Sequence, residues 1–482
     1  MVKGALTAKL IATVAIVALG SLQFGYHMAE LNSPQAILSC ALSVPGNTKY
    51  KKTFFGSHGF KKCITLSSEQ IGLVTSIFSI GGLIGSFYVG TIADKIGRKR
   101  TTLFHNVIFF VGSFLNATAN SFAVLLAGRF IAGIGAGSAI VVTLLMINEI
   151  APDQYKGFLG LMNQVSINVG ILLTQVLALW LCTNNSWRYL LLTGSVIAAI
   201  NFCLILSYMD ESPVWLYNNG KAVDAFKVLH SLRGGEYSDS RNEVNSWKSG
   251  GVGDEESLLS DESSRATSGS STVTLTEYLR LLEYKNSRLV ATGILVFQQF
   301  CGINSIIFYG VSVLISIFPD AAIFINCLIS IVNAVVTFAS APLIDRLGRK
   351  PLLKTSVLMM GISAVLLGYG ISTKNALFSV VGTFVYITFF AVGLGPIPFL
   401  LVGEVTQQKA KAPAQSWGVT MNWVATFVVG FLFPILKNSW IGAGVYYIFA
   451  VMCILTFLFV QRFVPETKGK HSYEEVWAQG PH

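Results

Sequence analysis

The sequence is poor in charged residues. Only 12% of its 482 residues are Asp, Glu, Lys or Arg, whereas soluble domains have about 25%. These charged residues are too few to cover the water-exposed surface of a soluble chain of this length. A soluble globular protein is therefore excluded. The formal net charge of +10 does not indicate a nucleic-acid partner, because the basic residues stand in short loops between apolar stretches.

Metal-ligating and catalytic patterns are lacking too. The seven cysteines and six histidines show no metal-ligand spacing. No Ser/His pair or carboxylate pair stands within the apolar stretches. We therefore expect neither an enzyme nor a resident metal or cofactor.

Apolar sequence is abundant, at 52% of the residues. A bilayer is crossed by about 20 apolar residues, and twelve stretches qualify. The first six are 9–30, 70–92, 102–119, 122–147, 158–181 and 187–208. The second six are 288–316, 321–344, 351–372, 376–403, 412–436 and 441–462. We expect an all-α membrane protein with twelve transmembrane helices, the first of which is an anchor and not a removed signal peptide.

One short segment occurs twice. Gly-Thr-Ile-Ala-Asp-Lys-Ile-Gly-Arg-Lys at 90–99 returns as Ala-Pro-Leu-Ile-Asp-Arg-Leu-Gly-Arg-Lys at 341–350. Two pairs of acids repeat at nearly the same offset: Glu149 with Glu404, and Glu211 with Glu466. A chain that repeats at half its length is built from two similar halves. In membrane proteins built this way the substrate lies between the halves near the bilayer midplane, so we predict two pseudo-symmetric six-helix halves and a transporter.

The expected halves are 1–208 and 288–462, followed by a short tail at 463–482. The connecting segment 209–287 has an amphipathic helical pattern over 211–235. It also has a Ser/Gly-rich stretch at 249–272, with too few large apolar residues to become ordered. Basic loops follow the second and eighth apolar stretches, which predicts that these loops and both termini are cytoplasmic.

Several motifs occur in order along the chain. They are Leu19-Gly-Ser-Leu-Gln-Phe-Gly-Tyr26, the two Asp–Gly-Arg-Lys loops, Gly128-Arg129-Phe130, Glu149-Ile-Ala-Pro152, Gln298-Gln-Phe-Cys-Gly-Ile-Asn304, Gly393-Leu-Gly-Pro-Ile-Pro398 and Pro465-Glu-Thr-Lys-Gly469. With them the chain resembles the sugar porter family of the major facilitator superfamily, close in pattern to animal glucose facilitators and fungal hexose transporters. The resemblance implies transport of a glucose-like hexose by alternating access.

The charged residues of the repeated loops and the repeated acids are candidate gating groups. They are Asp94, Arg98, Lys99, Glu149 and Glu211 in the first half, and Asp345, Arg349, Lys350, Glu404 and Glu466 in the second. We expect ion pairs across the cytoplasmic seam that hold the halves together while the pore faces outward and loosen when it opens inward. Alternatively, the basic residues only anchor their loops on the cytoplasmic side.

Amide side chains inside apolar stretches are candidate sugar ligands, because they donate to and accept from neutral hydroxyls without burying charge. They are Gln164, Gln298, Gln299, Asn304 and Asn333. Polar groups avoid lipid, so these should face the protein interior. Hydrogen bonding between helices is the alternative for any single amide. The resemblance adds Phe24, Phe399 and Asn422 to the cavity.

The first helix bears on energetic coupling. In proton-coupled members of the family, an Asp follows Phe-Gly-Tyr and can pair with an Arg of the fourth helix, here Arg129. This chain has His27 instead. An imidazole beside a buried guanidinium should stay neutral, since like charges disfavour protonation. We therefore expect facilitated uniport. Proton-coupled symport with a histidine switch is the alternative, and a non-transporting sugar sensor is a more distant one.

Cys40 and Cys63 bracket the long non-cytoplasmic loop at 31–69 and could form a disulfide if that side is oxidising. The expected partners are a sugar and the lipid bilayer, and the unit is a monomer. The resemblance to fungal vacuolar-type relatives leaves a vacuolar or a plasma membrane open.

Overall fold

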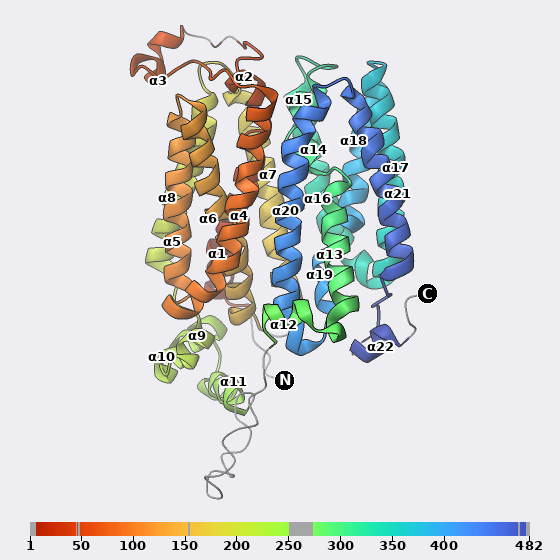
Figure 1. Ribbon diagram of the computed structural model, residues 1–482. Helices are drawn as coiled ribbons and strands as arrows, with labels where there is room; N and C mark the ends of the chain where they lie inside the picture. Colours follow the sequence, from red (N-terminus) through yellow and green to blue (C-terminus); the bar gives the residue numbers. More distant parts are fainter. Residues whose placement is uncertain are drawn as a thin grey trace, which may run out of the picture.

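The computed structural model describes residues 6–44, 46, 49–152, 155–249, 273–470 and 473–478. Within these ranges every regular element is helical. Figure 1 shows two bundles standing side by side, with the early helices in one and the late helices in the other. The Ser/Gly-rich stretch lies outside the described residues from 250 onward.

The first bundle contains six long helices. They are α1 (Ala8–Ala29), α4 (Ser68–Ile96), α5 (Arg98–Thr118), α6 (Phe122–Ile150), α7 (Lys156–Leu181) and α8 (Trp187–Tyr208). Each overlaps one of the first six predicted stretches.

The second bundle also has six crossing segments, two of which are interrupted. The continuous ones are α16 (Ala322–Leu347), α17 (Arg349–Ser372), α20 (Lys411–Lys437) and α21 (Val445–Phe463). The predicted stretch 288–316 is not one helix but three pieces, α13 (Lys285–Phe300), α14 (Asn304–Ile307) and α15 (Gly310–Leu314). The stretch 376–403 comprises α18 (Ala376–Phe389), a π-helical turn (Phe390–Leu394) and α19 (Ile397–Glu404). Pro396 and Pro398, which have no N–H, account for this second break.

In the described residues, ten of these segments are long and apolar enough to cross a membrane, the interrupted segment Ala376–Glu404 among them. The remaining two are α13–α15, which is broken, and α5, which starts with three basic residues and buries polar side chains such as His105 and Asn106. The chain is thus an all-helical membrane protein with the twelve-helix arrangement of two six-helix halves.

Short helices lie at both ends of the bundles. Between the halves are α9 (Pro213–Asn218), α10 (Ala222–Arg233), α11 (Tyr237–Ser249) and α12 (Leu275–Arg280), and α22 (Tyr473–Trp477) follows the second half. They share one end of the molecule with both termini, here called the linker side (Figure 1). The predicted helix over 211–235 is therefore two helices, α9 and α10.

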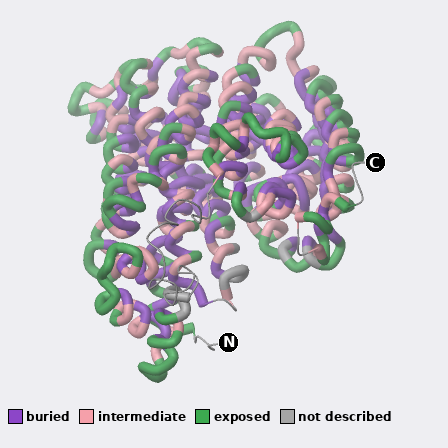
Figure 2. Tube along the Cα trace, turned by 60° about the horizontal axis from the view of Figure 1, so that its bottom comes forward, coloured by how far each residue is buried: buried purple, intermediate pink, exposed green. Residues whose placement is uncertain are grey.

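The opposite end carries α2 (Gln35–Leu38), a 3-10 turn (Tyr50–Lys52) and α3 (Phe54–Ser57) (Figure 1). Cys40 and Cys63 are joined by a disulfide there, so we call this end the disulfide side. The buried guanidinium of Arg188 fixes the loop by donating to the carbonyls of Lys61, Ala117 and Ala119. Figure 2 shows the buried residues inside the bundles and exposed ones around their rims.

Candidate functional site

A row of amides lies inside the second half, between α13, α14 and α20. Asn304 Nδ2 donates to Gln299 Oε1 at 2.7 Å, and Gln299 Nε2 donates to Gln298 Oε1 at 3.3 Å. Asn422 Nδ2 donates to the same Gln298 oxygen at 2.8 Å. Gln298 and Gln299 are neighbours in α13, Asn304 begins α14 and Asn422 lies in α20, so the tertiary fold brings these predicted ligands together.

Gln298 has a structural task in this row. Its Nε2 donates to the carbonyls of Leu394 and Gly395, at 2.7 and 3.0 Å. These carbonyls belong to the break between α18 and α19, where helical hydrogen bonding is interrupted. Asn304 differs, because its Oδ1 is buried and has no hydrogen-bond partner among the described residues. Asn304 therefore retains an acceptor for a ligand, whereas the Gln298 amide is fully engaged.

The other predicted ligands lie where the two halves meet. Asn333 Nδ2 of α16 is 3.4 Å from Asn168 Oδ1 of α7. Phe24 of α1 stacks edge-on against Trp423 of α20, with ring centroids 6.0 Å apart. Phe399 is 40% exposed on α19. Gln164 is exposed and lies one helical turn from Asn168, on the same face of α7.

The halves are closed together on the disulfide side. Asn32, which follows α1, donates to the carbonyls of Ile306 and Ile307, and its Oδ1 accepts from the Val311 N–H at 2.9 Å. Ser68 at the start of α4 accepts a hydrogen bond from Asn438 after α20, at 2.8 Å. These contacts join residues of opposite halves and close that end.

The two halves pack closely at two glycines of α4. A Cβ built on Gly72 of α4 would lie 2.6 Å from the Phe431 carbonyl oxygen of α20, and one on Gly82 would lie 2.7 Å from the Trp423 ring. Nothing lies within 4 Å of a Cβ on Gly90, two turns further along α4.

The charged candidates form two similar networks, one in each half. Arg98 binds Glu149 through Nη2 at 2.7 Å and Asp94 at 3.0 Å. Glu211 accepts from the N–H groups of Arg98 and Lys99 at 2.7 and 3.1 Å, and so caps the first turn of α5.

In the second half Arg349 binds Glu404 at 2.9 Å, and Glu466 accepts from the N–H groups of Arg349 and Lys350. The side chain of Asp345 lies outside the described residues. The pairs that we expect across the seam while the pore faces outward are not formed among the described residues in this conformation. Each carboxylate binds within its own half: Glu149 and Glu404 lie near the ends of α6 and α19, and Glu211 and Glu466 follow the last long helix of their halves.

Gly97 separates α4 from α5 and allows this capping. Its φ is 99°, and a Cβ there would lie 2.2 Å from Glu211 Oε2. Replacing it with Ala is expected to destabilise the protein by about 2 kcal/mol or more, since a left-handed L-residue alone costs ~1–2 kcal/mol. The measurement is thermal unfolding in detergent, with Gly90→Ala as the matched control because its Cβ meets nothing. Equal melting temperatures for the two variants would contradict this role of Gly97.

The surroundings of Arg129 differ from the expectation. Its Nη1 binds Glu30 Oε1 at 2.7 Å, and both side chains are fully buried. His27 Nδ1 lies 2.9 Å from the other oxygen of Glu30. The premise that no fixed negative charge stands beside Arg129 is therefore wrong: Glu30, three residues after His27, supplies it. Residues i and i+3 share a helix face. A carboxylate at position 30 can therefore face Arg129 as one at position 27 would.

Sequence reasoning missed four residues of these sites: Glu30, Asn32, Asn168 and Trp423. Glu30 and Asn168 could have been found, because a carboxylate or amide at the end of or within an apolar stretch is costly and faces protein. Asn32 and Trp423 carry no such signal in the sequence.

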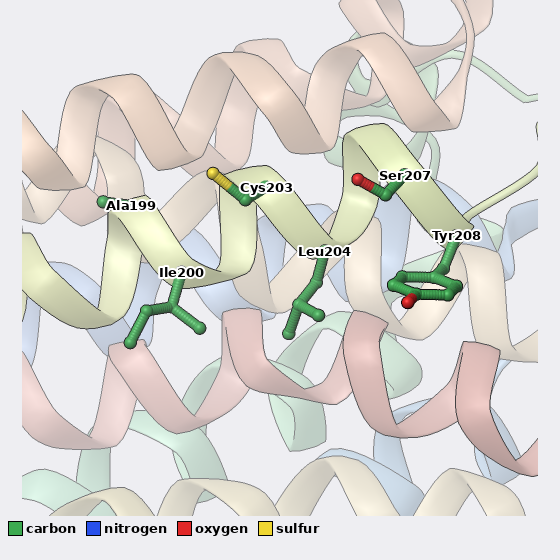
Figure 3. Close-up of a pocket in the computed structure, with 6 residues that line it drawn as sticks. All are labelled: Ala199, Ile200, Cys203, Leu204, Ser207 and Tyr208. Atoms are coloured by element: carbon green, nitrogen blue, oxygen red, sulfur yellow. The ribbon is translucent and has the colours of Figure 1, made fainter.

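A groove on the outer surface of the first half is a different feature. Ala199, Ile200, Cys203, Leu204, Ser207 and Tyr208, all from α8, line it (Figure 3). Ile200 and Tyr208 are 53% and 69% exposed. Its lining is mostly apolar and faces away from the bundle, so it suits lipid chains and not a polyhydroxylated ligand.

Comparison with known proteins gives a consistent result. Residues 13–477 match the family described as sugar (and other) transporters. The chain is 46% identical to a probable metabolite transport protein of Saccharomyces cerevisiae, over 99% of this chain and 96% of the relative. It is 30% identical to facilitated glucose transporter member 1 of Gallus gallus, over 98% and 93%.

Among solved structures, the inward open conformation of the xylose transporter XylE from E. coli superposes with a TM-score of 0.75. That pair is 24% identical and the match covers 98% of this chain and 99% of the other, so it supports the fold alone. With the paired halves, the repeated loops and the family match over nearly the whole length, the chain belongs to the sugar porter family of the major facilitator superfamily and is a membrane transporter of sugars, not an enzyme.

Proposed function

We propose that the protein carries a glucose-like hexose across its membrane by alternating access, with the linker side cytoplasmic. The observation that carries the proposal is the row of amides Asn304, Gln299, Gln298 and Asn422 inside the second half. Amides there can both donate to and accept from sugar hydroxyls. The Asn304 Oδ1 and Asn168 Nδ2 atoms have no protein partner among the described residues, which leaves one acceptor and one donor for a ligand.

Aromatic rings complete the site. Phe24 and Trp423 meet beside the amides, and the half-exposed Phe399 lies on the linker side of the break in α18–α19. The flat C–H face of a hexose packs well on such rings. Two relatives, the Gallus gallus protein and a plastidic glucose transporter of Arabidopsis thaliana at 31% identity, carry glucose in their names, which supports a hexose substrate.

The test is flux of radiolabelled D-glucose into liposomes that contain the purified protein, with L-glucose as the control. We expect D-glucose to exchange faster than L-glucose. Equal rates for both, or rates equal to those of protein-free liposomes for every hexose tried, would refute the proposal. A non-transporting sensor would bind sugar without flux, so the same experiment separates the two functions.

We further propose that the unit is a monomer, since one chain contains both halves and the site between them. A relative at 38% identity is named vacuolar protein sorting-associated protein 73. This favours an internal membrane such as that of the vacuole over the plasma membrane. Glu30 supplies a carboxylate beside Arg129, so His27 after Phe-Gly-Tyr does not favour facilitated uniport over proton-coupled symport.

A further inference from the structure

The loop that precedes α4 has charges of one sign only. From residue 31 to residue 68 the chain has five lysines and no Asp or Glu. The lysines are Lys49, Lys51, Lys52, Lys61 and Lys62, and all of them are exposed. None of them forms an ion pair with another described residue. Segment 49–62, here called the lysine loop, is therefore a cationic patch on the disulfide side without a counter-charge of its own.

The fold brings the lysines together from two segments. The Tyr50 hydroxyl donates to the Lys61 carbonyl at 2.9 Å. Lys51 and Lys52 directly follow Tyr50 in a 3-10 turn, and Lys62 directly follows Lys61. Two pairs of adjacent lysines, about ten residues apart in sequence, thus lie on neighbouring segments of one compact loop.

Contacts with α8 hold the backbone of the lysine loop in place. Trp187 Nε1 donates to the Lys62 carbonyl at 2.9 Å, and Arg188 Nη2 donates to the Lys61 carbonyl at 2.8 Å. The next residue, Cys63, is one partner of the disulfide. The backbone is therefore fixed while the ammonium groups stay exposed. A surface that is ordered beforehand loses less entropy when it binds a partner.

An apolar ring is exposed among these lysines. Helix α3 turns Phe55 inward against Tyr189 of α8, with ring centroids 5.1 Å apart, and leaves the neighbouring Phe54 60% exposed. Figure 1 shows α3 at the outer edge of the first half, away from the second half. Tyr189 lies in the first turn of a membrane-spanning helix, so α3 stands where that helix leaves the bilayer. Aromatic side chains are enriched at this level of a membrane.

We propose that the lysine loop is an interfacial anchor that binds anionic phospholipid headgroups of the leaflet on the disulfide side. The ammonium groups reach the phosphates, and the lysine methylene groups and the Phe54 ring lie against the apolar region just below. Retention of basic residues in the cytoplasm does not account for these lysines when the linker side is the cytoplasmic one, as proposed above.

The exposed ring distinguishes a lipid surface from a soluble polyanion as the partner. A soluble polyanion would bind the lysines but would leave Phe54 in water. A lipid surface uses both kinds of side chain, because its phosphates lie directly above apolar chains. The position of α3 at the lipid-facing edge of the first half favours the same partner.

Chemical modification of lysines in lipid nanodiscs tests the proposal, because reagents reach both faces of a nanodisc. The protein is reconstituted in phosphatidylcholine alone or in phosphatidylcholine mixed with anionic phosphatidylglycerol. It is then treated with an uncharged amine reagent, and the modified lysines are located by peptide mass mapping. We expect the anionic lipid to slow modification of Lys51, Lys52, Lys61 and Lys62 about fivefold each, which corresponds to ~1 kcal/mol per lysine at an anionic surface.

Lys374 is the control within the same chain. It is exposed between α17 and α18 on the disulfide side of the second half, so it reports the general effect of an anionic surface on a single lysine. We expect its modification rate to change clearly less than the rates in the lysine loop. Equal rates for the lysine loop in the two lipid mixtures, or equal slowing of Lys374, would overturn the anchor.

The variant Phe54→Ser and a soluble polyanion separate the two partners. Phe54 is exposed, so the variant keeps the fold, and we expect it to lose much of the protection by phosphatidylglycerol. Tripolyphosphate added to the protein in phosphatidylcholine nanodiscs should protect the lysines less than the anionic lipid does. If tripolyphosphate protects them as well as the lipid, or if Phe54→Ser keeps the full protection by the lipid, the loop binds a polyanion through charge alone and the lipid anchor is refuted.

Discussion

Replacing Asn304 with Ala is expected to lower D-glucose flux about tenfold at low sugar concentration, and adding Gln299→Ala about a hundredfold in total. The loss of one well-placed hydrogen bond to a hydroxyl costs ~0.5–1.5 kcal/mol, and 1.4 kcal/mol is tenfold in affinity. Asn304 has an Oδ1 without a protein partner among the described residues, and its Nδ2 orients Gln299 at 2.7 Å. The double variant therefore loses two adjacent hydroxyl partners.

Flux measured over a range of sugar concentrations should show the effect mainly as a raised KM, because contacts to the bound sugar are removed. Asn219→Ala is the control, since this exposed amide ends α9 on the linker side. Gln298→Ala is expected to behave differently and to lower thermal stability, because the carbonyls of Leu394 and Gly395 lose their donor. Equal flux in the wild type and in a folded double variant would remove Asn304 and Gln299 from the site.

Cross-linking the closed end is expected to abolish transport. Ser68 and Asn438 are hydrogen-bonded at 2.8 Å although 370 residues apart in sequence. A bond between cysteines in these places, made by Ser68→Cys with Asn438→Cys, keeps the disulfide side shut. Alternating access requires that side to open once per cycle, so flux should fall to the level of protein-free liposomes.

A short bifunctional thiol reagent that a reductant cleaves makes the experiment reversible, and flux should return after cleavage. The two single variants treated in the same way control for modification of one residue alone. In the part of the chain that the structure describes, the free cysteines other than Cys203 are buried, and the Cys40–Cys63 pair is already oxidised. Undiminished flux in a protein shown to be fully cross-linked would mean that the contacts of Ser68 and Asn32 do not form a gate.

The contacts that close the disulfide side lie close in sequence to Glu30. Asn32 lies two residues beyond Glu30 and binds across the halves. Gating on the disulfide side thus rests on neutral hydrogen bonds. The charged networks of Arg98 and Arg349 stay within their own halves on the linker side.

The sequence by itself determined the membrane-spanning class, the two repeated halves, the family resemblance and the amides that face the interior. These follow from local composition: long apolar stretches, few charges and a segment that occurs twice are all visible without knowledge of contacts. The breaks at Pro396 and Pro398 were predictable for the same reason, since proline acts on its own helix.

The tertiary structure decided which residues meet, because that depends on helix rotation and on packing between distant segments. Glu30 faces Arg129 only because α1 and α6 present those faces to each other. Likewise, Glu149 and Glu211 bind within the first half because α6 and the start of α9 pack beside the loop at Gly97. Gln298 turned from a presumed sugar ligand into a support for a broken helix, since the carbonyls it satisfies come from a segment almost a hundred residues later in the chain. The amide and charged residues in the sequence limit which hydrogen bonds and ion pairs are possible. The packing of the helices determines which of them form.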